Sequence, residues 1–137
     1  MPGIPGINGL RATDRALLTV NSSTGQLLEV PLHGGPIVVL AADLPGDGLA
    51  VGADGSVFVV THPFNTIERI APGGARTTIG SSANGVWGPT DIDVLPNGDL
   101  LVVQDGGAFV RLLPAPVRLL FPSAPYANAQ LLRLRLR

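Results

Sequence analysis

The sequence predicts an all-β protein built from three repeated units of four antiparallel strands. Turn dipeptides recur along it, because Asp14-Arg15, Asp54-Gly55 and Asn97-Gly98 begin 40 and 43 residues apart. Each lies between short apolar runs, and Asp-Gly or Asn-Gly in that setting favours a tight hairpin because these residues tolerate positive φ. Four strands repeating every ~40–50 residues are typical of the blades of a β-propeller. Three such blades amount to half of a six-bladed ring.

The middle unit shows the pattern most clearly. Its apolar runs at 48–51, 57–60 and 66–70 predict a three-stranded meander, and the third unit repeats it at 91–94, 100–103 and 108–112. A fourth strand is expected after each meander, at 36–40, 75–79 and 117–121. The predicted blades therefore cover about 6–40, 44–79 and 86–121, within one region of residues 1–121. The second strands around Val59 and Val102 are apolar throughout, which predicts burial on both faces.

Residues 122–137 form an atypical tail. Leucines at 132, 134 and 136 alternate there with arginines at 133, 135 and 137. This period of two predicts a strand with one apolar and one cationic face. Three interpretations stay open: the strand pairs with an open blade edge, it contacts an acidic partner, or the tail is a non-native terminus.

Composition excludes several classes of protein. The chain has 45% apolar residues and a net charge of −1, so it is expected to fold rather than stay disordered. Neither the charge balance nor the 4% aromatic content suggests nucleic-acid binding. The absence of cysteine excludes disulfides and zinc–thiolate sites. No apolar run reaches the ~20 residues of a membrane span, and the N-terminal residues do not resemble a signal peptide, so we expect no membrane association and a cytoplasmic location.

Antiparallel meanders determine which loops share an end of the molecule. The residues before each first strand, the turns between second and third strands and the blade-to-blade connections are expected at one end. That end collects the polar residues Asn8, Asn21, Asp47, His62, Asp91 and Asp105 together with the loop 80–89. The opposite end receives Asp14, Asp54 and Asn97, which are explained as hairpin residues.

Asn8 and Asp47 occupy one repeat position, immediately before the innermost strands. An amide oxygen and a carboxylate are hard ligands that suit Ca²⁺ or Mg²⁺, and a carboxylate also serves Zn²⁺. A turn formed by these side chains with their own backbone is the alternative. His62 could bind metal or move protons, or could be a structural turn residue before Pro63. Trp87 is interpreted as packing between blades or as a ligand platform, and the serines lack a nucleophile elbow.

Four motifs in order resemble a known family. They are Ile7-Asn8-Gly9-Leu10, Gly46-Asp47-Gly48-Leu49, the run 61–67 (Thr-His-Pro-Phe-Asn-Thr-Ile) and Gly88-Pro89-Thr90. Together they resemble the senescence-marker-protein, gluconolactonase and luciferin-regenerating-enzyme-like six-bladed propellers, and most closely a little-characterised microbial and fungal branch. The resemblance implies a divalent metal bound by Asn8 and Asp47. It also implies that Asp47 is the general base of lactone hydrolysis.

The chain departs from that family in having three predicted blades, with no counterpart of the family's glutamate ligand. The function expected from the resemblance is metal-dependent hydrolysis of a lactone or related ester, with Asn21, His62, Asp91 and Asp105 as ligand-binding residues. The alternatives are a non-catalytic propeller that binds a small ligand or protein, and an inactive fragment of a larger propeller. Exposed apolar blade faces predict either a homodimer that completes a six-bladed ring, with the tail strand completing a blade of its partner, or an aggregation-prone monomer.

Overall fold

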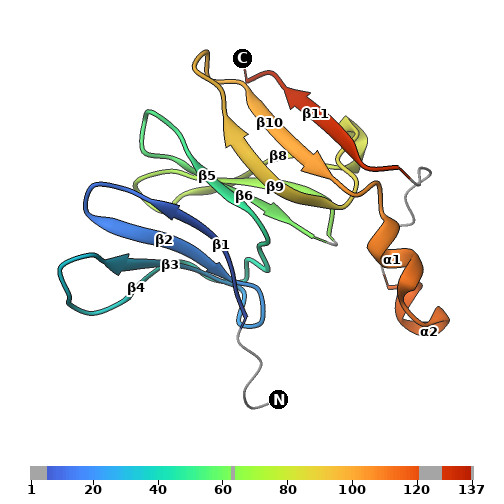
Figure 1. The fold of residues 1–137 in the computed structure, drawn as a ribbon, viewed down its shortest axis with the longest axis horizontal. Helices are drawn as coiled ribbons and strands as arrows, with labels where there is room; N and C mark the ends of the chain where they lie inside the picture. Colours follow the sequence, from blue (N-terminus) through green and yellow to red (C-terminus); the bar gives the residue numbers. More distant parts are fainter. Residues whose placement is uncertain (1–5, 63, 121–127, 137) are drawn as a thin grey trace.

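The computed structural model describes residues 6–62, 64–120 and 128–136, which form three antiparallel sheets arranged as a fan (Figure 1). The first sheet has the order β1-β2-β3-β4 and the second the order β5-β6-β7-β8. The strands of these sheets are β1 (Ile7–Ala12), β2 (Ala16–Asn21), β3 (Gln26–Pro31), β4 (Val38–Ala41), β5 (Leu49–Val51), β6 (Val57–Thr61), β7 (Thr66–Ile70) and β8 (Arg76–Gly80). The strands predicted at 36–40, 48–51, 57–60, 66–70 and 75–79 are thus found within a few residues of their expected positions.

The third sheet has three strands, in the order β11-β10-β9. Its first two strands are where the repeat predicts them, at β9 (Pro89–Val94) and β10 (Leu100–Gln104), after a short 3₁₀ helix, η1 (Ser82–Asn84). The predicted strand at 108–112 is wrong, because these residues form helix α1 (Ala108–Leu112). The predicted strand at 117–121 is also wrong over its described part, since α2 (Ala115–Arg118) includes its first two residues; residue 121 lies outside the described residues.

Local hydrogen bonding explains why helix replaces strand after β10. The Asp105 carboxylate accepts hydrogen bonds from the backbone N–H groups of Gly107 (2.6 Å) and Phe109 (3.0 Å), which satisfies donors at the start of α1. Pro114 follows this helix and precedes α2, and a proline there cannot donate to a strand ladder. One side chain of α1, Val110, is buried.

The tail supplies the missing third strand. β11 (Gln130–Leu134) pairs in register with β10, from Leu100 opposite Leu134 to Gln104 opposite Gln130. Its alternation has the predicted consequence: Leu132 and Leu134 pack against the core, while Arg133 contacts the Asp99 carboxylate at 2.6 Å. The tail strand therefore pairs with an open edge within its own chain, which is the first of the three interpretations that the sequence left open.

Two apolar cores lie between the sheets, and the alternation of the strands assigns residues to each. We call the face of a sheet that points along the fan toward the third sheet its forward face, and the opposite face its rear face. In β2, β6 and β10 the forward residues are Leu18 and Val20, Phe58 and Val60, and Leu101 and Val103; the rear residues are Leu17 and Thr19, Val57 and Val59, and Leu100 and Val102.

Each core joins a forward face to the rear face of the next sheet. The first core holds Val20 together with Val59, and the second holds Val60 together with Val102. β6 is buried at every position, and Val59 and Val102 are both fully buried, as the sequence predicts. β10 differs from the prediction because Val103 is 47% exposed, since no sheet of the described residues covers the forward face of the third sheet.

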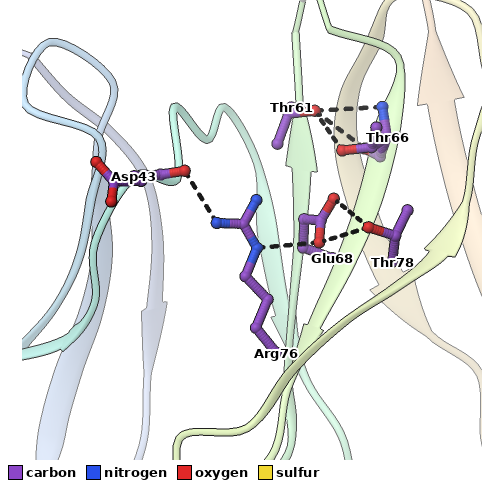
Figure 2. A network of polar contacts seen from close by, with 6 residues as sticks. All are labelled: Asp43, Thr61, Thr66, Glu68, Arg76 and Thr78. Atoms are coloured by element: carbon purple, nitrogen blue, oxygen red, sulfur yellow. Dashed lines mark hydrogen bonds and ion pairs between the residues drawn. The ribbon is translucent and has the colours of Figure 1, made fainter.

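A buried polar network links β7 to β8 and joins the second sheet to the segment that follows the first sheet. Glu68 on β7 is 3% exposed and accepts hydrogen bonds from Thr78 and from Arg76, whose Nε lies 3.0 Å from Glu68 Oε2 (Figure 2). Burial raises the pKa of Glu68, but hydrogen bonds from Thr66, Arg76 and Thr78 and the charge of Arg76 outweigh it and hold the pKa below its usual value. Arg76 also donates to the Asp43 carbonyl (2.9 Å), which joins β8 to the segment after β4.

The helices of the described ranges are short. None of them has the length and apolar character needed to cross a lipid bilayer.

Candidate functional site

The polar residues singled out from the sequence lie at one end of the fan. β1 begins at this end, and β6 and β10 end there, so the residues before β5, after β6 and after β10 approach one another (Figure 1). Helix α1 follows β10 at the same end. The turns at Asp54 and Asn97 lie at the other ends of the same strands.

Close packing of the innermost strands explains the glycines of the Asn-Gly-Leu and Asp-Gly-Leu motifs. The Gly9 N–H donates to the Asp47 carbonyl (2.8 Å), and a Cβ on Gly9 would lie 2.9 Å from the Gly48 Cα. One sheet further, a Cβ on Gly48 would lie 2.6 Å from the Asp91 Cα. Side chains larger than hydrogen therefore do not fit where one inner strand passes the next.

Asp47 is held in place by its backbone on both sides. Its N–H donates to the Val60 carbonyl (2.8 Å), while its own carbonyl accepts from Gly9. Burial raises the pKa of the half-buried Asp47 carboxyl; the charge of His62 and a hydrogen bond from Asn8 oppose this, and the charges of Asp91 and Asp105 add to it. The net result is a carboxyl whose pKa is raised above its usual value, which makes its carboxylate a stronger proton acceptor than an ordinary aspartate.

His62 and Asp105 form the second polar pair. His62 Nε2 lies 3.2 Å from Asp105 Oδ2, and the two side chains are 12% and 24% exposed. The Phe109 ring packs edge-on against His62, with ring centroids 4.9 Å apart. Because Asp105 also accepts the Gly107 and Phe109 N–H groups, its position is fixed by the start of α1. A carboxylate fixed in this way orients the imidazole and selects its tautomer.

Asp91 joins the third sheet to the first. Arg11 Nη2 on β1 lies 3.1 Å from Asp91 Oδ1 and donates to the Ile92 carbonyl, also at 3.1 Å. Both side chains are substantially exposed, so the pair positions the inner strands more than it stabilises them. Arg11 was not predicted as a site residue, and no motif in the sequence marks it.

The remaining predicted residue, Asn21, is used by its own turn. Its Oδ1 accepts the N–H groups of Ser23 and Thr24, both at 3.1 Å. Asp54 acts in the same way at the opposite end, where Oδ1 accepts the Ser56 N–H (3.0 Å). Asp47 differs from these turn residues because its carboxylate interacts with another strand through Asn8.

Two buried amide side chains that were not predicted as site residues hold the loop before β9. Asn65 Oδ1 accepts the Gly88 N–H (2.7 Å), and Asn65 adopts a φ of 63°, which asparagine tolerates. Gln104 Oε1 accepts the Trp87 N–H (2.9 Å), and its Nε2 donates to the Gly85 carbonyl (3.0 Å). Asn65 belongs to the run 61–67 identified in the sequence, but Gln104 is the last residue of the otherwise apolar strand β10 and belongs to no motif.

A metal ion at this end would take few ligands from the protein. Across the described ranges, no three His, Asp or Glu side chains are grouped so that they could hold an ion. Asp105 is engaged by His62 and two backbone N–H groups, and Asp91 by Arg11. Asn8 and Asp47 thus offer two oxygen ligands, a set that fits a cation such as Mg²⁺, which usually keeps several waters.

The cavity at the opposite end is unrelated to these residues. It has a volume of about 550 Å³, lies between the first two sheets, and is lined by turn residues that include Asp14, Asp54 and Pro72. None of the candidate site residues lines it.

Comparison with known proteins relates the chain to propellers. No protein-family model matches it, and no curated protein matches it in sequence. Among solved structures, a gluconolactonase from Xanthomonas campestris is 17% identical with a TM-score of 0.70, covering 96% of this chain and 44% of the other. Virginiamycin B lyase from Staphylococcus aureus is 21% identical with a TM-score of 0.62, covering 76% and 36%.

A chain from a nidogen–laminin complex is similar to the same degree, with 21% identity, a TM-score of 0.62, and coverage of 72% and 40%. At these identities the likeness is one of fold. The chain spans less than half the length of each of these three structures.

Proposed function

We propose that the three sheets are half of a lactonase-like propeller whose site hydrolyses a lactone or related ester. The observation that carries the proposal is the approach of Asn8, Asp47 and the His62–Asp105 pair at the end where the inner strands begin. A carboxyl with a raised pKa beside an oriented imidazole is an arrangement suited to acid–base catalysis. The similarity to a gluconolactonase supports the choice of a lactone as the substrate class.

In the proposed reaction Asp47 is the general base. Its carboxylate removes a proton from water while the water oxygen bonds to the lactone carbonyl carbon, which produces a tetrahedral oxyanion. The oxyanion collapses, the bond between the carbonyl carbon and the ring oxygen breaks, and the ring oxygen takes a proton. His62 is placed to supply that proton, and Asp105 orients its imidazole through the 3.2 Å contact between His62 Nε2 and Asp105 Oδ2. The product is the open hydroxy acid, and the proton held by Asp47 returns to solvent or to His62.

Asn8 and Asp47 are the residues that would hold a divalent metal ion. A bound Ca²⁺, Mg²⁺ or Zn²⁺ would polarise the carbonyl and lower the pKa of bound water. Asn8 also donates a hydrogen bond to Ser22 Oγ (3.4 Å), and Ser22 donates to the Gly46 carbonyl (2.5 Å), so these contacts orient Asn8 beside Asp47.

The test compares two aspartates that precede a glycine in the same sheet. D-glucono-δ-lactone is the probe, ring opening is followed by acid release with and without added Mg²⁺, Ca²⁺ or Zn²⁺, and metal binding is measured by calorimetry. Asp47→Asn should lower the hydrolysis rate by about 100-fold or more, the usual contribution of a general base. Asp54→Asn is the control, because Asp54 only bonds its own turn and Arg69.

Equal effects of the two substitutions on hydrolysis and on metal binding would show that the site assignment is wrong. If the parent protein hydrolysed the lactone without binding metal, the proposed metal site would be rejected, while the role of Asp47 as the general base would stand.

A non-catalytic propeller that binds a small ligand or a protein is the second candidate. The similarity to a chain of a nidogen–laminin complex favours it. Under this hypothesis Asp47 and His62 bind a ligand without turnover, and an inactive fragment of a larger propeller would show neither binding nor hydrolysis.

A further inference from the structure

The two ends of the fan expose faces that are buried elsewhere in the same molecule. On the rear faces, the first strands carry an equivalent apolar residue: Leu49 and Ile92 are 0% and 1% exposed, whereas Leu10 is 51% exposed. All three are paired with the equivalent residue of the second strand, which for Leu10 is Thr19. Leu10 is therefore a core residue of the repeat that lacks its neighbouring sheet.

The forward faces show the same relation in the opposite direction. Val20 and Val60 occupy equivalent positions of β2 and β6 and are both 0% exposed, while Val103 of β10 is 47% exposed. Leu131 lies opposite Val103 on β11 and is 65% exposed. A hollow of about 260 Å³ lies on this face, where Leu101 and Val103 line it together with Asp91, Ile92 and Asp93 of β9 and Arg11 of β1.

Among the described residues, the forward face of the third sheet and the rear face of the first sheet are thus uncovered. These are the two kinds of surface that already pack together twice within the chain, in the cores that contain Val20 with Val59 and Val60 with Val102. A surface that is complementary to another surface of the same molecule forms a head-to-tail contact, which closes into a ring when the rotation allows. The chain also matches 44% of the gluconolactonase chain, close to half of a ring.

We infer that a second copy of this chain covers both faces, so that the third sheet of each copy packs on the first sheet of the other. The resulting pair has twofold symmetry and six sheets. Where the innermost strands meet, this contact between copies differs from the two contacts between sheets within one chain. At the repeat position occupied by Gly9 in β1 and by Gly48 before β5, the third sheet has Asp91. The closing contact is therefore made by the middle of the sheets, around Leu10 and Val103.

The pairing has a consequence for the site that rests on the proposed function. If the twofold axis coincides with the central axis of the six-sheet ring, both copies of Asn8 and Asp47 lie at the same end of the dimer. Four oxygen ligands then surround the central channel of the ring. This supplies the ligands that a single chain lacks.

The experiment measures the mass of the full chain in solution by light scattering. The parent protein should show twice the chain mass of 14.1 kDa. Leu10→Lys and Val103→Glu alter side chains that are half-exposed in the single chain, so each variant should fold and be monomeric. Leu119→Lys is the control, because Leu119 is 85% exposed and lies on neither face, and this variant should remain a dimer.

Mixing the two monomeric variants distinguishes this arrangement from a contact between like faces. In a mixed pair, one contact is unchanged and the other brings the introduced lysine of one copy to the introduced glutamate of the other as an ion pair, so the dimer mass should return. A monomeric parent with a cooperative melting transition, monomers in the mixture, or a series of larger polymers would each overturn the inference. The mass does not depend on catalysis, so an inactive dimer would reject only the proposed function.

Discussion

Replacement of Val59 by aspartate should unfold the protein at neutral pH. Val59 is fully buried between the first two sheets, and it lies opposite Leu49 on one neighbouring strand and Glu68 on the other. A fully buried carboxyl has its pKa raised by about 3–5 units, to about 7 or above, so the introduced group is protonated in the folded protein at pH 7. Binding that proton at about 3 pH units above the unfolded pKa of about 3.9 costs about 4 kcal/mol, at about 1.36 kcal/mol per unit. Loss of the valine adds about 2 kcal/mol.

The sum, about 6 kcal/mol, is comparable to the whole stability of a small domain, about 5–15 kcal/mol. Urea denaturation followed by circular dichroism is the assay, at pH 7 and at pH 4. The difference from the parent should shrink at pH 4, because a carboxyl with an unfolded pKa of about 3.9 is then about half protonated in the unfolded chain as well. Leu119→Asp is the control for adding a charge at an exposed position. A Val59→Asp variant with an unchanged urea midpoint at pH 7 would refute the burial argument.

Two further predictions concern the inner strands. Gly48→Ala should destabilise the protein by about 1–3 kcal/mol, the usual cost of overpacking. The new Cβ would lie 2.6 Å from the Asp91 Cα and 2.7 Å from the Thr90 carbonyl oxygen. The control in the same urea titration is Gly73→Ala, because no atom lies within 4 Å of a Cβ placed on Gly73. Asp47→Asn should make stability less dependent on pH. The folded-state pKa of Asp47 is raised, so Asp47 contributes most to the free energy of unfolding below its unfolded pKa of about 3.8. This contribution is lost as the pH rises through the folded-state pKa. Across that pH range the stability of the variant relative to the parent should therefore increase. A parent and variant with parallel pH–stability curves would contradict this.

Local turn chemistry explains why most of the fold was predictable. Asp54-Gly55 and Asn97-Gly98 each provide a side chain that bonds the turn backbone and a glycine with positive φ, so neighbouring apolar runs had to pair as hairpins. The polar end of the fan followed from strand direction alone. The prediction that Asp47, His62 and Asp105 share this end needed no knowledge of packing.

The composition of the third sheet could not be predicted, because two segments could each pair with β10 and only tertiary contacts decide between them. Residues 108–112 and 130–134 are both short apolar segments, and periodicity does not decide which of them pairs with β10. The choice depends on Asp105, which binds the start of α1 from just outside the apolar segment, and on Asp99, which binds Arg133, 34 residues further along the chain. Gln104 and Arg11 were missed for the same reason, since their partners lie 17 to 81 residues away.

The return of β11 to β10 also has a kinetic consequence. The turn between β9 and β10 contains 5 residues, 95–99, whereas 25 residues, 105–129, separate β10 from β11. Closing a loop five times longer costs about 1.4 kcal/mol more entropy. The hairpins of the first two sheets can therefore form early, and β11 is expected to join last and to leave first. In hydrogen exchange the amides of Leu132 and Arg133 should exchange with the solvent faster than that of Val59, and equal protection of all three would show that the third sheet forms together with the rest.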